Sequence, residues 1–183
     1  MQVEMAQPVP TSLRTILPLI QANIAAVTGL PAPARVMITA RNADAVPHFQ
    51  ADADILIRLM RERQDFDVNT GQGRVENRWE ATVRVTVRSR LYTDEVNQDQ
   101  QFLIDQTLGH IVLRDRVTDA LEFGFDFLTT SQGDSYIFEP LRVPNWSDPE
   151  REREDAMWGD SWCEVTLHYI RSLTQNASWA LNS

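Results

Sequence analysis

Residues 78–92, RWEATVRVTVRSRLY, alternate between apolar and polar side chains along almost their whole length. Because successive side chains of a strand point to opposite faces of a sheet, this alternation predicts one apolar and one polar face. The apolar face carries Trp79, Ala81, Val83, Val85, Val87 and Leu91. The polar face carries Glu80, Thr82, Arg84, Thr86, Arg88 and Arg90. Branched Val and Thr side chains suit a pleated surface, so we predict a long strand in the middle of a sheet, with its apolar face in the core.

The composition is that of a globular protein with a single domain. The chain has 183 residues, of which 43% are hydrophobic and 23% are charged. No repeat or linker divides it, so we expect one domain over residues 1–183, with an extended lead-in at residues 1–11 and a flexible tail at residues 174–183. No apolar run approaches the roughly 20 residues that cross a membrane, and the N-terminus lacks a signal-peptide pattern. The single Cys163 excludes an internal disulfide and favours a reducing compartment.

Three elements are predicted before the central strand. A helix begins after Thr11 or Ser12, which suit the N-cap position, and it ends at Gly29. A short strand follows at residues 35–40, and a longer strand occupies residues 54–63, where apolar residues lie on both faces at first.

Helices and two further strands are predicted after the central strand. One helix covers residues 93–111, with acidic residues in its first turn, and a second helical stretch covers residues 113–123. Alternation then predicts strands at residues 136–141 and 162–170. The resulting order, α-β-β-β-α(α)-β-β, indicates an α+β fold: a mostly antiparallel sheet of about five strands, with helices packed on one face and the other face uncovered.

The segment between the two long strands, residues 64–77, is long, polar and contains Gly71 and Gly73. Connections of this length within compact domains are uncommon and usually functional. We predict a long projecting β-hairpin. The sequence leaves open whether it is a surface loop or an arm that contacts another subunit, for which Gln72, Arg74 and Arg78 are the candidate contact residues.

A search for catalytic or metal-binding patterns favours a protein without chemistry of its own. His48, His110 and His168 are predicted in a loop, a helix and a strand, without the spacing of a metal site. Cys163 lies on the apolar face of the last strand, which is typical of an inert buried thiol. No nucleotide-binding pattern follows the glycines of residues 71–73. We expect no enzyme activity, no cofactor and no metal.

The charges suggest contacts with partners but leave two interpretations open. A net charge of −9 argues against gripping nucleic acid. Arg84, Arg88 and Arg90 either bind an anionic ligand on the uncovered sheet face or form salt bridges to carboxylates of neighbouring strands.

Two tryptophans are predicted in loops outside the regular alternation. Trp146 and Trp158, with Arg151 and Arg153 nearby, have the composition of a protein interface. The alternative is that these tryptophans cover the open end of the sheet itself.

In its order of elements the chain resembles the tail terminator and tail completion proteins of long-tailed bacteriophages. The resemblance runs from about Leu13 to Leu173: an amphipathic helix, a short strand, two long hairpin strands, then helix and final strands. It includes the junction between the central strand and an acidic helix, VRVTVRSRLYTDEVNQDQQFLIDQ.

This resemblance implies a structural protein of the virion tail or neck, assembled in the host cytoplasm. It implies a homo-oligomer, a hexameric ring that caps the tail tube, stops tube growth and joins the tail to the head connector. The partners implied are the tail tube protein and the head–tail connector or adaptor, with DNA passing through the lumen only as cargo and no membrane. Two alternatives stay open: a head-closure or neck adaptor protein, and a small binding domain from outside phages with an anionic ligand on the open sheet face.

Overall fold

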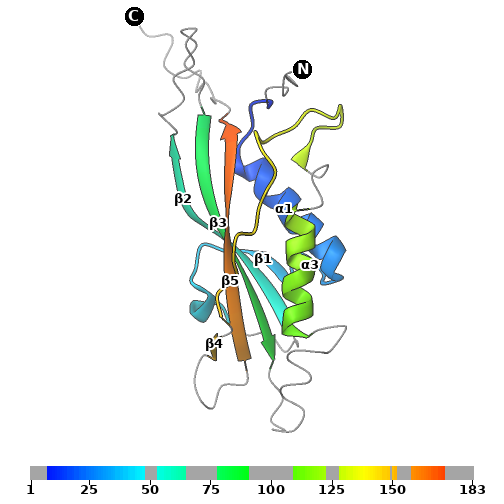
Figure 1. Ribbon diagram of the computed structural model, residues 1–183, viewed down its shortest axis with the longest axis vertical. Helices are drawn as coiled ribbons and strands as arrows, with labels where there is room; N and C mark the ends of the chain where they lie inside the picture. The colour runs from blue at the N-terminus through cyan, green and yellow to red at the C-terminus, as the bar shows by residue number, and fades with distance from the viewer. Residues whose placement is uncertain are drawn as a thin grey trace, which may run out of the picture.

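The computed structural model describes residues 8–47, 53–64, 78–90, 109–122, 128–148, 150–151 and 158–171. Two helices pack on one face of a mixed sheet (Figure 1). The elements are α1 (Leu13–Thr28), β1 (Val36–Ile38), the 3-10 turn η1 (Ala43–Ala45), β2 (Ala53–Gln64), β3 (Arg78–Arg90), α3 (His110–Glu122), β4 (Glu150–Arg151) and β5 (Trp158–Ile170). The predicted α+β class is confirmed.

Strand β3 lies at the centre of the sheet, as the alternation predicted. The strand order is β1-β2-β3-β5-β4, with β1 parallel to β2 and the other pairs antiparallel. β3 pairs with β5 from Arg78↔Ile170 to Arg90↔Trp158, and with β2 along its other edge. Four strands of three residues or more form the sheet, while β4 adds a two-residue pair beside the start of β5.

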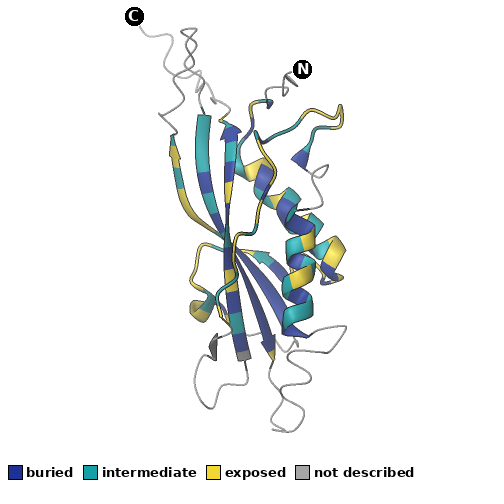
Figure 2. Cartoon of the chain, in the orientation of Figure 1, coloured by how far each residue is buried: buried dark blue, intermediate teal, exposed yellow. Residues whose placement is uncertain are grey.

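The core lies between the sheet and the two helices, and it uses the face of β3 that the sequence indicates. Ala81, Val83, Val85 and Val87 are completely buried. They meet the buried side chains of β5 and of the two helices, which are Cys163, Val165, Leu167, Tyr169, Ile16, Ile20, Ile24, Leu113, Val117, Ala120 and Leu121. Figure 2 shows the buried stripe of each helix turned toward the sheet.

Helix α1 begins and ends where the sequence predicts. Ser12 takes the N-cap position with an extended backbone, and its carbonyl accepts hydrogen bonds from the N–H groups of Thr15 and Ile16. Gly29 follows the last helical residue with φ of 76°, a left-handed conformation that glycine adopts without steric cost, and its N–H donates to the carbonyl of Ala25. Pro18 lies inside the helix, beyond its first turn, where it lacks the N–H that would donate to the carbonyl of Arg14.

The strand predicted at residues 136–141 is wrong. This segment consists mostly of bends that run beside β5, and it bonds that strand through Phe138 N, which donates to the carbonyl oxygen of His168 at 2.9 Å. The Ser135 hydroxyl bonds both the N–H and the carbonyl of Ile137, so a local turn takes the backbone groups that a strand would need. Pro140 lacks the N–H needed to continue a ladder.

The last strand begins at Trp158, four residues before the predicted start at Trp162. Gly159 and Ser161 look like turn residues, yet both are buried on the inner face, where Ser161 meets a histidine of α3. The helical stretch predicted at residues 113–123 corresponds to α3. Most of the helix predicted at residues 93–111 lies outside the described residues, and so do the arm at residues 65–77, the first seven residues and the tail.

We predict that Val85→Ala lowers the free energy of unfolding by about 1–3 kcal/mol, because two methyl groups leave a fully packed position and a cavity remains. Chemical denaturation monitored by circular dichroism measures this loss. Thr82→Ala, on the outer face of the same strand, is the matched control and should change stability by less than about 0.5 kcal/mol. Equal losses at both positions would contradict the assignment of faces.

Candidate functional site on the outer sheet face

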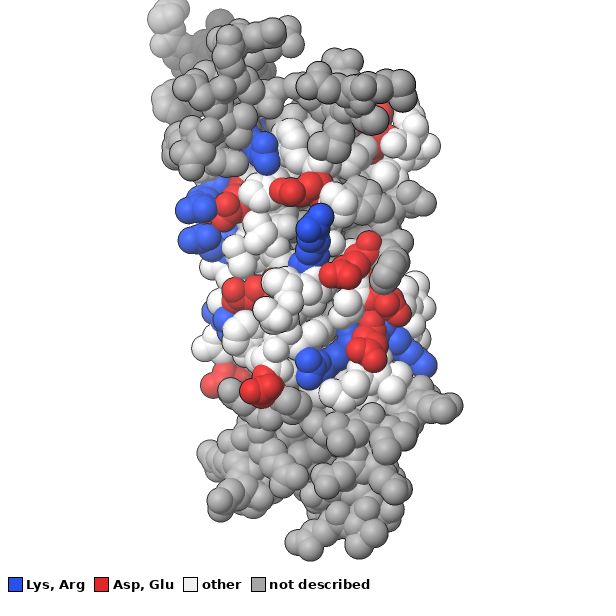
Figure 3. Space-filling model, viewed as in Figure 1, with Lys and Arg blue, Asp and Glu red and all other residues white. Residues whose placement is uncertain are grey.

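The face of the sheet opposite the helices, called here the outer face, carries the polar residues of β2, β3 and β5. Register places side chains in rows across these strands, such as Arg58–Arg84–Glu164. Figure 3 shows acidic and basic side chains interspersed over the visible surface, without a large area of one sign. On the outer face itself, the described ion pairs Arg61–Glu80, Arg63–Glu80 and Arg84–Glu164 set basic beside acidic side chains, so the face offers local charge contacts more than a continuous field.

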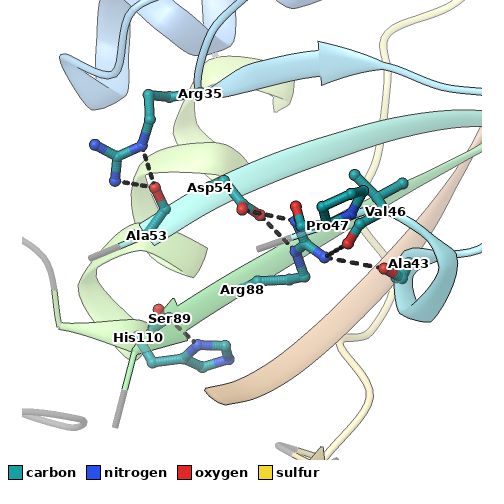
Figure 4. Close-up of polar contacts among 9 residues, drawn as sticks. All are labelled: Arg35, Ala43, Val46, Pro47, Ala53, Asp54, Arg88, Ser89 and His110. Atoms are coloured by element: carbon teal, nitrogen blue, oxygen red, sulfur yellow. Dashed lines mark hydrogen bonds and ion pairs between the residues drawn. The ribbon is translucent and has the colours of Figure 1, made fainter. Parts of the chain in front are cut away.

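A buried ion pair closes one end of the outer face. Arg88 donates from Nε and Nη2 to the two carboxylate oxygens of Asp54, at 2.6 and 2.7 Å, and the side chains are 2% and 0% exposed (Figure 4). Arg88 Nη1 also donates to the carbonyls of Ala43 and Val46, at 2.9 and 2.8 Å. The pair thus holds residues 42–47 over the sheet, which corrects the expectation that this face is uncovered throughout.

Two of the three candidate arginines of β3 form salt bridges to carboxylates of neighbouring strands, as one of the two interpretations predicted. Arg84 bonds Glu164 on β5, with Nη2 2.7 Å from Oε1, and its guanidinium lies 4.1 Å from the centre of the Trp162 ring. Arg88 bonds Asp54 on β2, as described, so it is not accessible to a partner. Arg90, at the end of β3, is exposed. The sequence placed these three arginines on one face correctly, but two of them have carboxylate partners within the chain.

A pocket of about 240 Å³ opens between residues 39–44 and the outer face. Its lining residues are Thr39, Arg41, Asn42, Ala43, Asp44, Leu56, Arg58, Arg84, Thr86, Asp160 and Trp162. Sequence reasoning did not identify Arg41 and Arg58 as site residues. The only signal was the polar position of Arg58 in the alternation of its strand, whereas Arg41 lies in a segment without periodicity.

On the inner face, His110 lies between two serine hydroxyls. Nδ1 is 3.1 Å from Ser89 Oγ and Nε2 is 2.6 Å from Ser161 Oγ, and the imidazole is completely buried. Burial, followed by the charge of Arg114, lowers the pKa of His110 to about 4, so the ring is neutral at neutral pH. This arrangement ties the start of α3 to the two central strands.

The other candidates for chemistry are placed as follows. Cys163 is buried in the core, where burial raises the pKa of its thiol to about 12, so the thiolate needed for reaction does not form at neutral pH. His168 lies on the outer face, 3.5 Å from a carboxylate oxygen of Glu139. His48 lies outside the described residues.

Of the predicted interface residues that the structure describes, Trp146 lies apart from the arginines of β3. Trp146 is half-buried against the core, where its Nε1 donates to Thr118 Oγ1 at 3.0 Å, so it covers the molecule's own interior. Arg78 lies 4.3 Å from the centre of the Phe138 ring. Trp158 and Arg151 belong to β5 and β4, which corrects their assignment to loops, and their side chains lie outside the described part of the structure. The same holds for all of Gln72, Arg74 and Arg153.

The two edges of the sheet differ in a way that the sequence did not reveal. The chain itself lines the edge of β5, through the bridge Trp146↔Cys163 and the pairing of β4. At the other edge, β1 covers β2 only along Ile55–Ile57. Beyond that point a β-bulge lies between Leu59 and Arg61, and Leu59 and Met60 are each 37% exposed. The second half of β2 is mostly exposed in Figure 2.

No family model matches the chain, and a search of curated proteins finds no significant match. Within the described residues, no three His, Cys, Asp or Glu side chains lie close enough together to hold a metal ion. None of the described helices has the length and apolar character needed to cross a membrane.

We predict that His110 makes the fold sensitive to mild acid. The pKa of His110 is about 4 in the folded protein and near 6.5 in the unfolded chain, so the unfolded state binds a proton first as pH falls. The free energy of unfolding should therefore decrease below about pH 6.5 by up to about 1.4 kcal/mol per pH unit, until the pH nears 4. Urea denaturation between pH 7 and pH 5 measures this slope.

The control for acid sensitivity compares two histidine variants. His110→Gln should lower stability at pH 7 and flatten the slope between pH 7 and pH 5, because the buried titrating group is gone. His168→Gln, on the partly exposed outer face, should keep most of the slope. An unchanged slope in His110→Gln would contradict the assignment.

We predict that Asp54→Asn destabilises the fold by about 3–5 kcal/mol, because it leaves the buried Arg88 guanidinium without its counter-charge. Glu164→Gln breaks the partly exposed pair with Arg84 and should cost only about 0–1 kcal/mol. Thermal and urea unfolding of the two variants measure the difference. Similar small losses in both would show that the Arg88–Asp54 pair is solvated in solution.

Proposed function

We propose that this chain is a structural virion protein, a phage tail terminator that assembles as a hexameric ring, caps the tail tube and joins the tail to the head connector. The observation that carries the proposal is the asymmetry of the sheet edges. Among the described residues, one edge is lined by parts of residues 138–148 and by β4, whereas β2 exposes the apolar side chains of Leu59 and Met60.

An asymmetric pair of edges is compatible with head-to-tail assembly. An open edge can pair with the same edge of a second copy across a two-fold axis, or it can contact a different surface of the next copy, and contacts of the second kind generate rings when the rotation closes. The bulge at Leu59–Arg61 disfavours a continuous strand ladder there. The contact that we propose is therefore made by side chains, chiefly those of Leu59 and Met60.

The arrangement of elements supports the resemblance on which the proposal rests. Helix α1, the short β1, the long β2 and β3, helix α3 and the long β5 follow one another in the expected order, without the strand expected at residues 136–141. The segment at residues 64–77, predicted as an arm, is the candidate that reaches the neighbouring subunit. A net charge of −9 suits a ring through which DNA slides without adhering.

We predict that Met60→Lys prevents ring formation while leaving the fold intact. The new ammonium group would have to lose its hydration at the subunit contact, whereas Met60 is exposed in the single chain. Val27→Lys is a matched control, because Val27 is 41% exposed on α1 and the substitution adds the same charge away from β2. Light scattering after size exclusion, with negative-stain images of each protein mixed with tail tubes of the same virus, measures assembly.

The outcomes separate the possibilities. Rings of wild type and Val27→Lys on tube ends, with monomeric Met60→Lys of unchanged melting temperature, support the proposal. Wild-type protein that stays monomeric with tubes present would overturn the terminator function. Rings that bind connector but never tubes would assign the chain to the head-closure adaptors. Normal rings of Met60→Lys would move the contact away from this edge.

A further inference from the structure

Two arginines face each other across the outer face without a shared counter-charge. Arg58 on β2 and Arg84 on β3 are direct partners in the antiparallel register. Like charges at opposed positions destabilise a sheet unless something neutralises them. Arg84 is neutralised by Glu164, whereas Arg58 makes no ion pair within the described part of the chain. One positive charge in this row therefore lacks compensation.

The contacts of Arg58 point to an incomplete set of partners. Its Nη1 donates to the side-chain oxygen of Asn42, which holds the guanidinium against residues 39–44. Its Nε is shielded from solvent and donates no hydrogen bond to the described residues. A buried donor without a partner is unfavourable, and native proteins usually satisfy such groups with protein atoms, water or a bound ion. Arg58 is thus oriented by one contact and has donors left over.

A third guanidinium lines the same pocket. Arg41 is exposed, and within the described residues its side chain has no hydrogen-bond or ion-pair partner. The hydroxyl-bearing residues Thr39 and Thr86 line the pocket as well. Three guanidinium groups and two hydroxyls from three separate segments therefore converge on a space of about 240 Å³.

We propose that this pocket binds a small oxyanion with at least two negative charges, a phosphate or a compact di- or tricarboxylate, through Arg41 and Arg58 with support from Arg84. Guanidinium groups match the oxygens of carboxylates and phosphates with paired, charge-assisted hydrogen bonds. The pocket is smaller than the roughly 300–1,000 Å³ of sites for drug-sized ligands, which favours a compact anion. The ring of Trp162 lies against the Arg84 guanidinium, and this cation–π contact keeps the guanidinium in place.

Two carboxylates limit the affinity of the site. Asp44 and Asp160 also line the pocket and repel an anion, and the net charge of −9 opposes its approach. Binding must therefore come from direct contacts, and it should weaken as salt concentration rises. Removing the charge of Asp44 should raise the affinity for the anion, whereas removing the charge of an arginine in the pocket should lower it.

The site does not depend on ring assembly, since all its residues come from one chain. The test uses the full-length protein at pH 7.5 in isothermal titration with sodium phosphate and, separately, with sodium citrate, against sodium chloride at matched ionic strength. Arg41→Gln should weaken binding at least about tenfold, because it removes charge-assisted hydrogen bonds. Arg58→Gln should weaken binding similarly, and Asp44→Asn should strengthen it. Arg142→Gln removes an exposed arginine outside the pocket and should bind as wild type does.

Melting curves without added anion distinguish a loss of binding from a loss of folding. Within the described residues Arg41 bonds only through its backbone N–H, and its side chain makes no hydrogen bond or ion pair, so Arg41→Gln should melt at the wild-type temperature and a loss of binding would not result from misfolding. Saturable binding of either anion that is lost in Arg41→Gln but kept in Arg142→Gln supports the proposal. No saturable binding of either anion up to about 10 mM overturns it, and so does binding that Arg41→Gln and Arg58→Gln both leave unchanged.

Discussion

The buried pair of Arg88 and Asp54 is the interaction on which the outer face depends. A guanidinium without contact with water is unfavourable unless every donor finds an acceptor. Here a carboxylate from β2 takes two donors, and carbonyls of residues 43–47 take others. The acceptors that one buried charged group needs thus fix an irregular segment of the chain over the sheet.

That segment in turn forms one wall of the arginine-lined pocket. Asn42, Ala43 and Asp44 line the pocket. The carbonyl of Ala43 accepts a hydrogen bond from Arg88, and the side chain of Asn42 accepts one from Arg58. Two arginines of neighbouring strands therefore have different roles. Arg88 is buried and holds residues 43–47 on the sheet, whereas Arg58 lines the pocket. The difference arises from partners, since Asp54 lies opposite Arg88 in the register, whereas Arg84 lies opposite Arg58.

The alternation of apolar and polar residues predicted those elements that have one face in the core and the other face outside it. The inner positions Ala81, Val83, Val85 and Val87 of β3 could be read from the sequence because they lie in the core under the helices, where a buried position selects an apolar residue. Residues 136–141 could not, because Ser135 and Pro140 favour a local turn that mere alternation does not reveal. The start of β5 was missed because Gly159 and Ser161 face the polar end of the core, near His110. Arg58 and Arg41 became site residues only through contacts between distant segments.

The pairing of β3 with β5 has a consequence for how the chain is made. β3 and β2 are neighbours in sequence and can pair soon after both have left the ribosome, but the other edge of β3 waits for residues 158–170. Until then Val83 and Val85 lie beside an unpaired row of backbone groups, a state that invites pairing with the wrong chain. Contacts of such long sequence separation also slow folding. Arg84 and Arg90 carry positive charge on the strand that waits for its partner, whereas Arg88 is already neutralised by Asp54 of β2. Like charges brought edge to edge repel each other, so these two arginines disfavour pairing with a second nascent copy.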